Sequence, residues 1–580
     1  MRCSFMHTEE GVDVDMQRGM SRRNFFKLGG AAALGAAGTA ALTGCSPQQA
    51  SDGVDAAEAT QSQNGWSWET APEPIDDSAI VETVEKDFIV VGAGLAGVST
   101  ACSIAENGGE VVVIEKNATY SWRGAHYGSI NNRRWREQGV EVDPTDVTRD
   151  WIAQCNSRCN ERLVWTFLNR SGEALDWLSD KVEAHGGVVD LLGCCYQNPT
   201  YKNITDPLFI LKVRFFHQTR RAAPTNEEIG NFEMAIYSLY NDAVDAGAEF
   251  SWNAKAAQLV KEDNRVTAVI AETEEGYKKF VGRKGVIMCT GDISGNDEMC
   301  EAYSPLMLRC EQTQYVPVGA NMGEGQQMGM WIGAKMEETP FSPMIHPQGY
   351  LQLSQWFLSV NTLGNRFMNE DTWGQGKSLG VLTTPGNADH AWCIFDSEWQ
   401  NQIPETLDIG GGMFWVGPDH LYGQEYSPGF NQGQFDTGVE NGMVKQGDTF
   451  EELADAIAAD EPSFDKEVFL AEVERYNELC RAGKDTDFGK REQLLYEIKN
   501  PPYYAAKYGP CRMVCPGDML INTNSQVLGE DDKPIEGLYA VGNCSGGLYA
   551  VDYPLVVLGD SHGRCVTFGY LLGRQLMGVE

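Results

Sequence analysis

A glycine-rich turn between a short apolar run and a helical segment constrains the fold of this chain more than any other feature. The apolar residues 88–91 lead into Gly92-Ala93-Gly94-Leu95-Ala96-Gly97, and a segment rich in Ala and Ser follows. In a strand–turn–helix unit of this kind, the first glycine allows the tight turn, the second lets the backbone approach a pyrophosphate, and the third lets the helix pack on the strand. The diphosphate then lies at the positive N-terminus of the helix.

A second apolar run extends this unit. Residues 111–114 are followed by Glu115, at about the spacing where an acidic residue binds a ribose hydroxyl. Strand, helix, second strand and acid in this order predict a Rossmann-like α/β domain, with Gly92, Gly94, Gly97 and Glu115 as dinucleotide contacts. The alternative is a glycine-rich turn that binds no ligand. Because no later stretch repeats the pattern, we expect one dinucleotide rather than two.

Two later apolar runs end in small or polar residues at the predicted carboxyl edge of the sheet. Residues 284–289 close on Thr290-Gly291, and residues 535–541 close on Gly542-Asn543. In doubly wound folds, ligands bind at this edge. We therefore expect all four residues to lie near the cofactor.

The charge and the cysteines narrow the classes of partner and cofactor. The formal net charge is −37 at pH 7, and no basic stretch offsets it, which argues against nucleic acid or an anionic lipid surface as a partner. The 16 cysteines form no Cys-x-x-Cys pair, no Cys-x-x-Cys-His haem attachment site and no zinc-binding spacing. We therefore predict no metal site and interpret most of the cysteines as small core residues.

The N-terminus carries two export features. Ser21-Arg22-Arg23-Asn24-Phe25-Phe26-Lys27 and the Ala/Gly-rich run 28–42 match a twin-arginine signal, which is recognised by the twin-arginine translocase. Leu42-Thr43-Gly44-Cys45 resembles a bacterial lipobox, so residues 1–45 are predicted to be a signal with lipidation at Cys45. Ordinary cleavage beside an incidental cysteine is the alternative. These features predict a location at the outer face of the cytoplasmic membrane or in the periplasm.

Residues 46–84 are predicted to be an acidic linker. They hold eight Asp or Glu residues and no Lys or Arg, with Ser, Gln, Ala and Pro between them. Such a composition is typical of a solvated tether. Trp66 and Trp68 are unusual in a tether, and the sequence does not decide whether they pack against the folded part.

Several further motifs occur in a fixed order along the chain. They are Thr290-Gly291, Asn321-Met322-Gly323-Glu324-Gly325, Gly364-Asn365-Arg366-Phe367-Met368-Asn369-Glu370, Asp487-Phe488-Gly489, Pro501-Pro502-Tyr503-Tyr504 and Gly537-Leu538-Tyr539-Ala540-Val541-Gly542. Together with the glycine fingerprint and Glu115, they resemble the flavoprotein family of soluble fumarate reductases, urocanate reductase and 3-ketosteroid dehydrogenases, over about residues 85–580. The resemblance implies an FAD-binding domain interrupted by an α+β capping domain, with the substrate between the cap and the isoalloxazine ring.

The resemblance also implies domain boundaries and cofactor contacts. The FAD-binding domain would comprise residues 85–343 and 511–580, and the capping domain residues 344–510. The further FAD contacts that it implies are Gly128, Ser129 and Asn131 under the flavin, Gly323 and Gly325 near the ring system, and Asn543 where fumarate reductases carry a flavin-contacting Glu. Because no His, Cys or Tyr is placed by a motif for covalent attachment, we predict that FAD is bound non-covalently.

Most of the residues that bind and protonate fumarate in the family are absent. The resemblance implies an arginine four residues after Asn369-Glu370, which acts as the proton donor, and a second arginine eleven residues after Gly542. In this sequence, Gly374 and Tyr553 occupy these two positions. Of the carboxylate clamp, only His346 remains. A buried dicarboxylate would therefore lack compensating cations, and simple fumarate is not the expected substrate.

Aromatic residues stand in place of these cations. The resemblance to ketosteroid dehydrogenases implies that Tyr553 hydrogen-bonds a substrate ketone, where a phenol stabilises the charge that forms when hydride adds to a conjugated C=C bond. Tyr350 is predicted to deliver the proton to the α-carbon, and His346 to bind an oxyanion or to tie the hinge. A packing role is the alternative for each tyrosine, and His126 and Tyr127 are the possible substitutes.

The sequence therefore predicts an exported, lipid-anchored FAD oxidoreductase that reduces an activated C=C bond of a small unsaturated substrate, an enoate or an enone. Because the chain has no haem motif and FAD fills the dinucleotide site, we expect an outside electron donor, most simply a membrane-bound multihaem cytochrome fed by quinol. Two alternatives stay open. One is a 3-ketosteroid-type dehydrogenase on the same scaffold, and the other is a non-catalytic flavin lipoprotein that transfers electrons.

Overall fold

The computed structural model describes residues 65–192, 210–215, 233–314, 319–354, 356–406 and 429–579, with the backbone alone for 210–215. The predicted signal at 1–45 and residues 46–64 of the predicted linker lie outside the described residues. Among the residues that the structure describes, none of the helices has the length and apolar character needed to cross a membrane.

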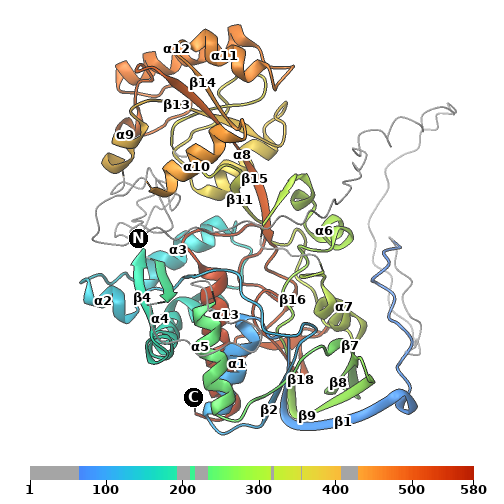
Figure 1. The fold of residues 1–580 in the computed structure, drawn as a ribbon. Coiled ribbons are helices and arrows are strands. Elements are labelled where there is room, and N and C mark those ends of the chain that lie inside the picture. Colours follow the sequence, from blue (N-terminus) through green and yellow to red (C-terminus); the bar gives the residue numbers. More distant parts are fainter. Residues whose placement is uncertain are drawn as a thin grey trace, which may run out of the picture. The chain divides into compact units, whose positions relative to one another are not determined.

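The first sheet carries the predicted strand–turn–helix unit at its centre (Figure 1). Its strand order is β17-β18-β8-β9-β1-β2-β6, with β7 paired to β8. The strands are β1 (Ile80–Val91), β2 (Val111–Ile114), β6 (Glu249–Ser251), β7 (Lys255–Glu262), β8 (Arg265–Thr273), β9 (Gly276–Met288), β17 (Gln526–Leu528) and β18 (Pro534–Ala540). The neighbours β6, β2, β1, β9 and β18 are parallel, so their carboxyl ends meet at one edge of the sheet.

Burial explains why the central strands are continuous apolar runs. Residues 88–91 of β1 and 111–114 of β2 are at most 3% exposed, because helices cover the sheet. The helices α1 (Leu95–Glu106), α5 (Met234–Asp245) and α13 (Asp560–Leu576) lie side by side against it (Figure 1). The predicted α/β class is confirmed.

Small residues bring α13 very close to α1. An added Cβ at Gly569 would lie 2.9 Å from the Cβ of Ser99, and one at Gly573 would lie 2.4 Å from Ser103 Oγ. Ser103 Oγ also donates a hydrogen bond of 2.8 Å to the carbonyl of Tyr570. This packing fixes where α13 begins, and therefore the position of its first residues at the carboxyl edge of the sheet.

A second sheet is formed by residues from the middle of the chain. Its order is β10-β15-β13-β12, and β11 and β14 also pair with β15. The strands are β10 (Gln312–Thr313), β11 (Met344–Tyr350), β12 (Leu358–Val360), β13 (Ala391–Asp396), β14 (Val444–Gly447) and β15 (Tyr503–Val514), and the helices that follow them in this region are α8 (Gly374–Thr383), α9 (Trp399–Thr406), α10 (Gly429–Glu440), α11 (Phe450–Ala458) and α12 (Lys466–Ala482). The long antiparallel pairing of β11 with β15 reaches from Tyr350 back to Met344, which pairs with Val514.

The remaining described elements are shorter or lie beside the two sheets. They are α2 (Arg133–Glu137), α3 (Pro144–Gln154), α4 (Glu161–Ala184), α6 (Asp297–Tyr303), α7 (Glu324–Trp331), β3 (His126–Tyr127), β4 (Gly187–Leu192), β5 (Ile210–Phe215), β16 (Met519–Leu520) and β19 (Ser545–Gly546).

One of the family-like motifs forms a buried ionic network behind the second sheet. The guanidinium of Arg366 donates to Glu370 at 2.9 Å and to Asp485 at 2.8 Å, and the Lys490 ammonium lies 3.4 Å from Glu370. All four side chains are at most 2% exposed. Each buried charge therefore has a partner of opposite sign, and removal of one member of the network would leave an uncompensated buried charge.

A second ionic cluster gives the same region a pH-dependent stability. His390 contacts Asp389 through Nδ1 at 2.9 Å and Glu461 through Nε2 at 2.6 Å. Burial opposes the charged imidazole, but the two carboxylates outweigh it and raise the pKa of His390. A raised histidine pKa stabilises the fold at low pH, and the contribution is lost as pH rises through the folded-state pKa.

We therefore expect His390→Asn to lower the free energy of unfolding by roughly 1.5–3 kcal/mol near pH 5.5, the usual worth of hydrogen bonds to a charged group. The loss should be smaller near pH 9, because the contribution of a histidine with a raised pKa is lost as pH rises through the folded-state pKa. Urea unfolding of both proteins at the two pH values measures this difference. Equal losses at both pH values would show that the charge of His390 contributes nothing.

The segment around the two tryptophans is packed against the folded part, which the sequence left open. Trp68 is 5% exposed and lies among Ile293, Met299, Cys300, Phe341, Ile345 and Cys515, with other buried residues. Trp331 Nε1 donates to the Trp68 carbonyl at 3.0 Å, and the Ser67 amide donates to Glu298 at 3.0 Å. From about Gly65 onward, the predicted linker is therefore part of the folded body.

Candidate active site

A large cavity of about 580 Å³ opens at the carboxyl edge of the first sheet. The ends of β1, β2 and β9 line it, together with the loop after β18 and the start of α13. Strands β11 and β15 of the second sheet add Met344, His346, Gln348, Met513 and Val514 to its lining. The cavity thus joins the predicted dinucleotide site to residues of the region that the sequence assigned to substrate binding.

The three fingerprint glycines have different roles in this geometry. Gly92 has φ +104°, and an added Cβ would lie 2.5 Å from the carbonyl oxygen of Cys289. A Cβ on Gly97 would lie 1.9 Å from the carbonyl oxygen of Gly92, so both positions exclude a side chain. A Cβ on Gly94 would meet only Ser121 Oγ, at 3.9 Å, and Gly94 lines the cavity as the N-cap of α1. The open space beside Gly94 therefore fits a pyrophosphate at the helix N-terminus.

Glu115 lines the cavity directly after β2. Its Oε2 accepts a 2.8 Å hydrogen bond from the Ala93 amide, and its Oε1 accepts from the Asn117 amide at 2.9 Å. The carboxylate therefore holds the glycine turn against the end of β2. Oε1 also accepts from the Asn117 side-chain amide at 2.7 Å. Oε2 keeps a second lone pair, so Glu115 can also accept a hydrogen bond from a ribose hydroxyl.

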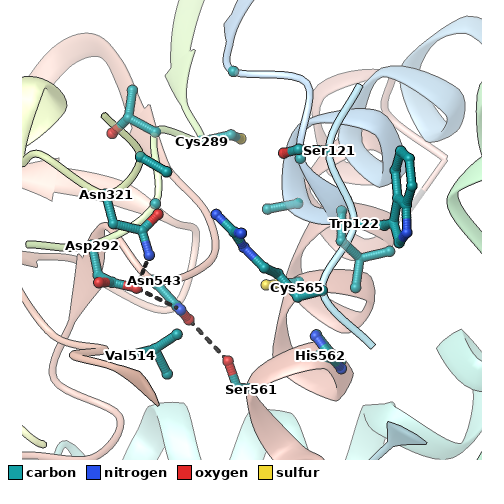
Figure 2. Close-up of a pocket in the computed structure, with 18 of the residues that line it drawn as sticks. Ser121, Trp122, Cys289, Asp292, Asn321, Val514, Asn543, Ser561, His562 and Cys565 are labelled. Atoms are coloured by element: carbon teal, nitrogen blue, oxygen red, sulfur yellow. Dashed lines mark hydrogen bonds between the residues drawn. The ribbon is translucent and has the colours of Figure 1, made fainter. Parts of the chain in front are cut away.

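A row of polar side chains forms one wall of the cavity (Figure 2). Asp292 Oδ2 accepts from the amide groups of Asn321 at 3.2 Å and Asn543 at 3.1 Å. Ser561 Oγ in turn donates to Asn543 Oδ1 at 3.1 Å. Ser121 lies on the opposite side of the cavity from Asp292 in Figure 2. This network fixes the orientation of the Asn543 amide, which the sequence predicted as a flavin contact.

Ten of the candidate residues line the cavity. They are Gly92, Gly94, Glu115, His126, Tyr127, Thr290, Gly291, His346, Asn543 and Tyr553. Two of the others act through packing, since a Cβ at Gly325 would lie 1.9 Å from Thr290 Oγ1 and one at Gly542 would lie 2.7 Å from the Cβ of Ala96. Gly323, with φ +75°, is the N-cap of α7, a backbone shape that suits glycine.

The three residues predicted under the flavin have structural partners instead and are not in the cavity lining. The Gly128 amide donates to the Gly559 carbonyl at 2.8 Å. Ser129 Oγ accepts from the Asn132 side chain at 2.9 Å, and the Asn131 side chain bonds both the amide and the carbonyl of Val142. These contacts hold the loop next to the lining residues His126 and Tyr127.

Tyr350 lies outside the cavity lining, so its placement does not support the predicted proton delivery to the substrate. Alternation along β11 would put it on the same face as His346 and Gln348. The backbone of Tyr350 is left-handed, however, with φ +71°, and the strand ends there. Its hydroxyl donates to Asp389 at 2.7 Å, within the His390 cluster.

Tyr553 is the best-placed catalytic candidate. Its side chain is buried and lines the cavity, and its ring centroid lies 6.4 Å from that of His346. The hydroxyl donates to the Asp560 carboxyl group and accepts a 3.1 Å hydrogen bond from the Ser561 amide. Burial raises the pKa of Tyr553 well above its ordinary range, and it lowers the pKa of His346 to about 3. Both side chains are therefore neutral at physiological pH.

Sequence reasoning missed several residues of the lining. Arg123 is half-buried in the cavity wall, and burial lowers the pKa of its guanidinium while the charge of Asp292 opposes that shift. His562 Nδ1 lies 2.9 Å from the His126 carbonyl, so this nitrogen is the donor and Nε2 is the basic position. No motif points to either residue. Asp292 could have been predicted from the sequence, because it directly follows Thr290-Gly291 at the end of a predicted strand.

Comparison with known proteins identifies the class of ligand. Residues 87–555 match the family described as FAD binding domain. A probable fumarate reductase of Shewanella frigidimarina is 26% identical over 84% of this chain and 74% of its own length. A digoxin reductase of Eggerthella lenta is 25% identical over 99% of both chains. The structure of a 3-ketosteroid-Δ4-(5α)-dehydrogenase from Rhodococcus jostii superimposes with a TM-score of 0.63 over 87% of this chain and 99% of that chain, at 20% identity.

Proposed function

Since the chain belongs to the FAD-binding domain family and is an FAD-dependent oxidoreductase acting on CH–CH groups, we propose that it reduces a C=C bond conjugated to a carbonyl, in an enone or an enoate other than fumarate. The observation that carries this proposal is the lining contributed by β11, β15 and the loop after β18. It combines the neutral hydrogen-bonding groups of Tyr553, His346 and Gln348 with apolar side chains such as Met513.

The residues present fit FAD. Gly94 at the N-terminus of α1 offers open space for the pyrophosphate, and Glu115 offers lone pairs to the adenosine ribose. When bound and reduced, the flavin supplies two electrons as a hydride. The chain's own residues then have to orient the substrate, exclude water and supply the proton.

Fumarate fits this cavity poorly. A dicarboxylate needs two compensating charges, and burial keeps His346 neutral. The described lining holds three Lys or Arg residues, Lys116, Arg123 and Lys255. Lys116 is paired with Glu324 at 2.6 Å, and Arg123 interacts with the charge of Asp292. None of the three comes from β11, β15 or the loop after β18, which line the proposed substrate side. A neutral carbonyl needs only hydrogen-bond donors, which Tyr553 can provide.

The same scaffold could run in the opposite direction as a ketosteroid-type dehydrogenase, and this is the second candidate. A buried tyrosine beside an apolar lining supports it, because a steroid ketone needs both an apolar surface and a donor. The likeness to the Rhodococcus jostii enzyme shows the fold and leaves the direction of reaction to experiment.

We also propose export by the twin-arginine translocase, lipidation at Cys45 and electron supply from a membrane-bound multihaem cytochrome. The sequence features at Arg22, Arg23 and Cys45 and the strongly acidic composition support these proposals. Fractionation of expressing cells tests export and lipidation. Mature protein in the soluble cytoplasmic fraction would count against export and anchoring.

A matched series of acceptors tests the proposed reaction. Under anaerobic conditions, with reduced viologen as the electron donor, methyl crotonate, crotonate and fumarate present the same type of C=C bond with no, one and two negative charges. We expect turnover of the neutral ester to exceed that of the monoanion and fumarate to be the poorest. Progesterone with an artificial electron acceptor tests the dehydrogenase direction. Fastest turnover of fumarate would overturn the proposed substrate class.

A further inference from the structure

Tyr553 is held by a buried carboxyl group on the first turn of α13. Asp560 is 0% exposed, and its Oδ1 accepts the hydrogen bond of the Tyr553 hydroxyl. The amide of the next residue, Ser561, donates to the same hydroxyl at 3.1 Å. The phenol oxygen is thus fixed from two sides by one helical turn, next to the cavity.

Among the described residues, Asp560 forms no ion pair, although the charge of Arg564 acts against the rise in its pKa. Arg564 lies one turn further along α13, but its guanidinium donates to the Gly542 and Ser545 carbonyls and to Ser545 Oγ. Within the described part of the chain, the second carboxyl oxygen of Asp560 has no hydrogen-bond partner. Burying a carboxylate in such surroundings is costly, and burial raises the pKa of Asp560 to about 8. At neutral pH it is therefore mainly the protonated acid.

We infer that Asp560 is a positioning residue that, as a carboxylic acid, directs the Tyr553 hydroxyl into the cavity and returns a proton to it after each reduction. This inference rests on the proposed function. When both the acid O–H and the Ser561 amide donate to the phenol oxygen, its own proton is free to bond a substrate carbonyl. When Asp560 is a carboxylate, it takes that proton itself, and the cavity loses the donor.

The proton transfers balance. Addition of a hydride to the β-carbon places negative charge on the substrate oxygen. The O–H bond of Tyr553 breaks, and an O–H bond forms on the substrate, which gives an enol. The O–H bond of Asp560 then breaks as its proton moves to the Tyr553 oxygen. Water restores the acid proton. The enol then isomerises to the saturated ketone or ester: its α-carbon takes up a proton and its O–H bond breaks, which releases that proton to water, so the net addition is one hydride and one proton.

The other ionisable groups around this pair do not titrate in the same range. Burial raises the pKa values of Tyr549 and of Cys155, the C-cap residue of α3, well above their ordinary values. His346 on β11 is neutral above about pH 3, and Arg564 stays charged. Asp552, beside Tyr553, has a pKa of about 6. A change near pH 8 at this site therefore reports on Asp560.

Infrared spectroscopy of the oxidised holoenzyme tests the protonation state without substrate. A protonated carboxyl group has a C=O stretch that a carboxylate lacks. We expect the wild-type spectrum minus the Asp560→Asn spectrum to contain such a band near pH 7, and we expect this difference band to disappear toward pH 10. Glu337→Gln is the matched control, since Glu337 is another buried acid, with a pKa of about 7, and its removal should leave the Asp560 band in place. An identical band in wild type and Asp560→Asn would overturn the inference.

The pH profile of turnover tests the positioning role. With methyl crotonate, wild-type kcat should fall above about pH 8, as the acid form disappears. Asp560→Asn keeps the shape and can still bond Tyr553 but has no acid proton to return, so kcat should drop by about 10² and the fall above pH 8 should vanish. A variant within about threefold of wild type that retains this fall would overturn the role. If the wild type reduces no unsaturated acceptor, the proposed function is wrong, and the proton transfer from Asp560 to Tyr553 is wrong with it. The infrared result then still decides separately whether Asp560 is protonated.

Discussion

Gly94→Val should yield a folded protein that has lost its flavin. The backbone at Gly94 has φ −80°, which any residue adopts, and the nearest side-chain atom to an added Cβ is 3.9 Å away. The valine Cβ therefore makes only an ordinary contact with Ser121, and the side chain fills the space where the pyrophosphate would approach the helix. We expect flavin affinity to fall on the order of 10²-fold or more, since such overpacking costs about 1–3 kcal/mol and the close backbone approach is also lost.

Acid precipitation measures this result, because non-covalently bound FAD appears in the supernatant and covalently bound flavin stays in the pellet. Gly433→Ala is the control, since its Cβ would meet nothing within 4 Å on α10. Gly97→Ala should differ from both, because its Cβ would collide with the Gly92 carbonyl and destabilise the fold itself. Full flavin content in Gly94→Val would mean that the fingerprint serves only the fold.

Tyr553→Phe should reduce turnover by on the order of 10²–10³, the usual effect of removing one oxyanion donor. The phenyl ring keeps the packing against the cavity wall, so KM should change much less than kcat. Steady-state reduction of methyl crotonate, with flavin content matched between variants, measures the changes in kcat and KM separately. Asp560 loses its partner in this variant, but as a neutral acid it should cost the fold only about 1 kcal/mol.

Tyr350→Phe provides the matched comparison for this prediction. It removes the same hydroxyl from a tyrosine whose partner is Asp389 and whose side chain lies outside the cavity lining. We expect its turnover to stay within about threefold of wild type. If Tyr350→Phe lost activity and Tyr553→Phe retained it, attention would move to a route for protons through the His390 cluster.

The sequence predicted those parts of the site that short, contiguous motifs define. Gly92, Gly94, Gly97 and Glu115 belong to one strand–turn–helix–strand unit, whose spacing alone fixes their geometry. Thr290, Gly291 and Asn543 follow apolar strands, so the parallel sheet brings them to one edge. Tyr553 could be placed only because its distance from the preceding strand matched a family pattern.

The residues that were missed depend on contacts between distant segments. Arg123 and His562 come from a loop and a helix separated by more than four hundred residues, and neither stands in a motif. Tyr350 was predicted as the proton donor because it follows His346 by four residues. In the structure its backbone is left-handed and its hydroxyl bonds Asp389, outside the cavity lining. The loop at Gly128 was assigned to the flavin by family position, whereas its close approach to Gly559 serves the packing of α13.

The packed tryptophan segment determines where a recombinant version of this protein can begin. Trp68 lies in a hydrophobic cluster that also contains Phe341, Ile345 and Cys515. Phe341 and Ile345 lie where the chain enters the second sheet, and Cys515 lies where the chain leaves it. A protein that starts after Glu69 would leave this apolar surface open to water and to other molecules, which favours aggregation. One that starts at or before Gly65 keeps Trp68 in place, together with the Ser67–Glu298 bond. The acidic composition of residues 46–84 suggests a dispensable tail, but Trp68 within it fills part of the hydrophobic core.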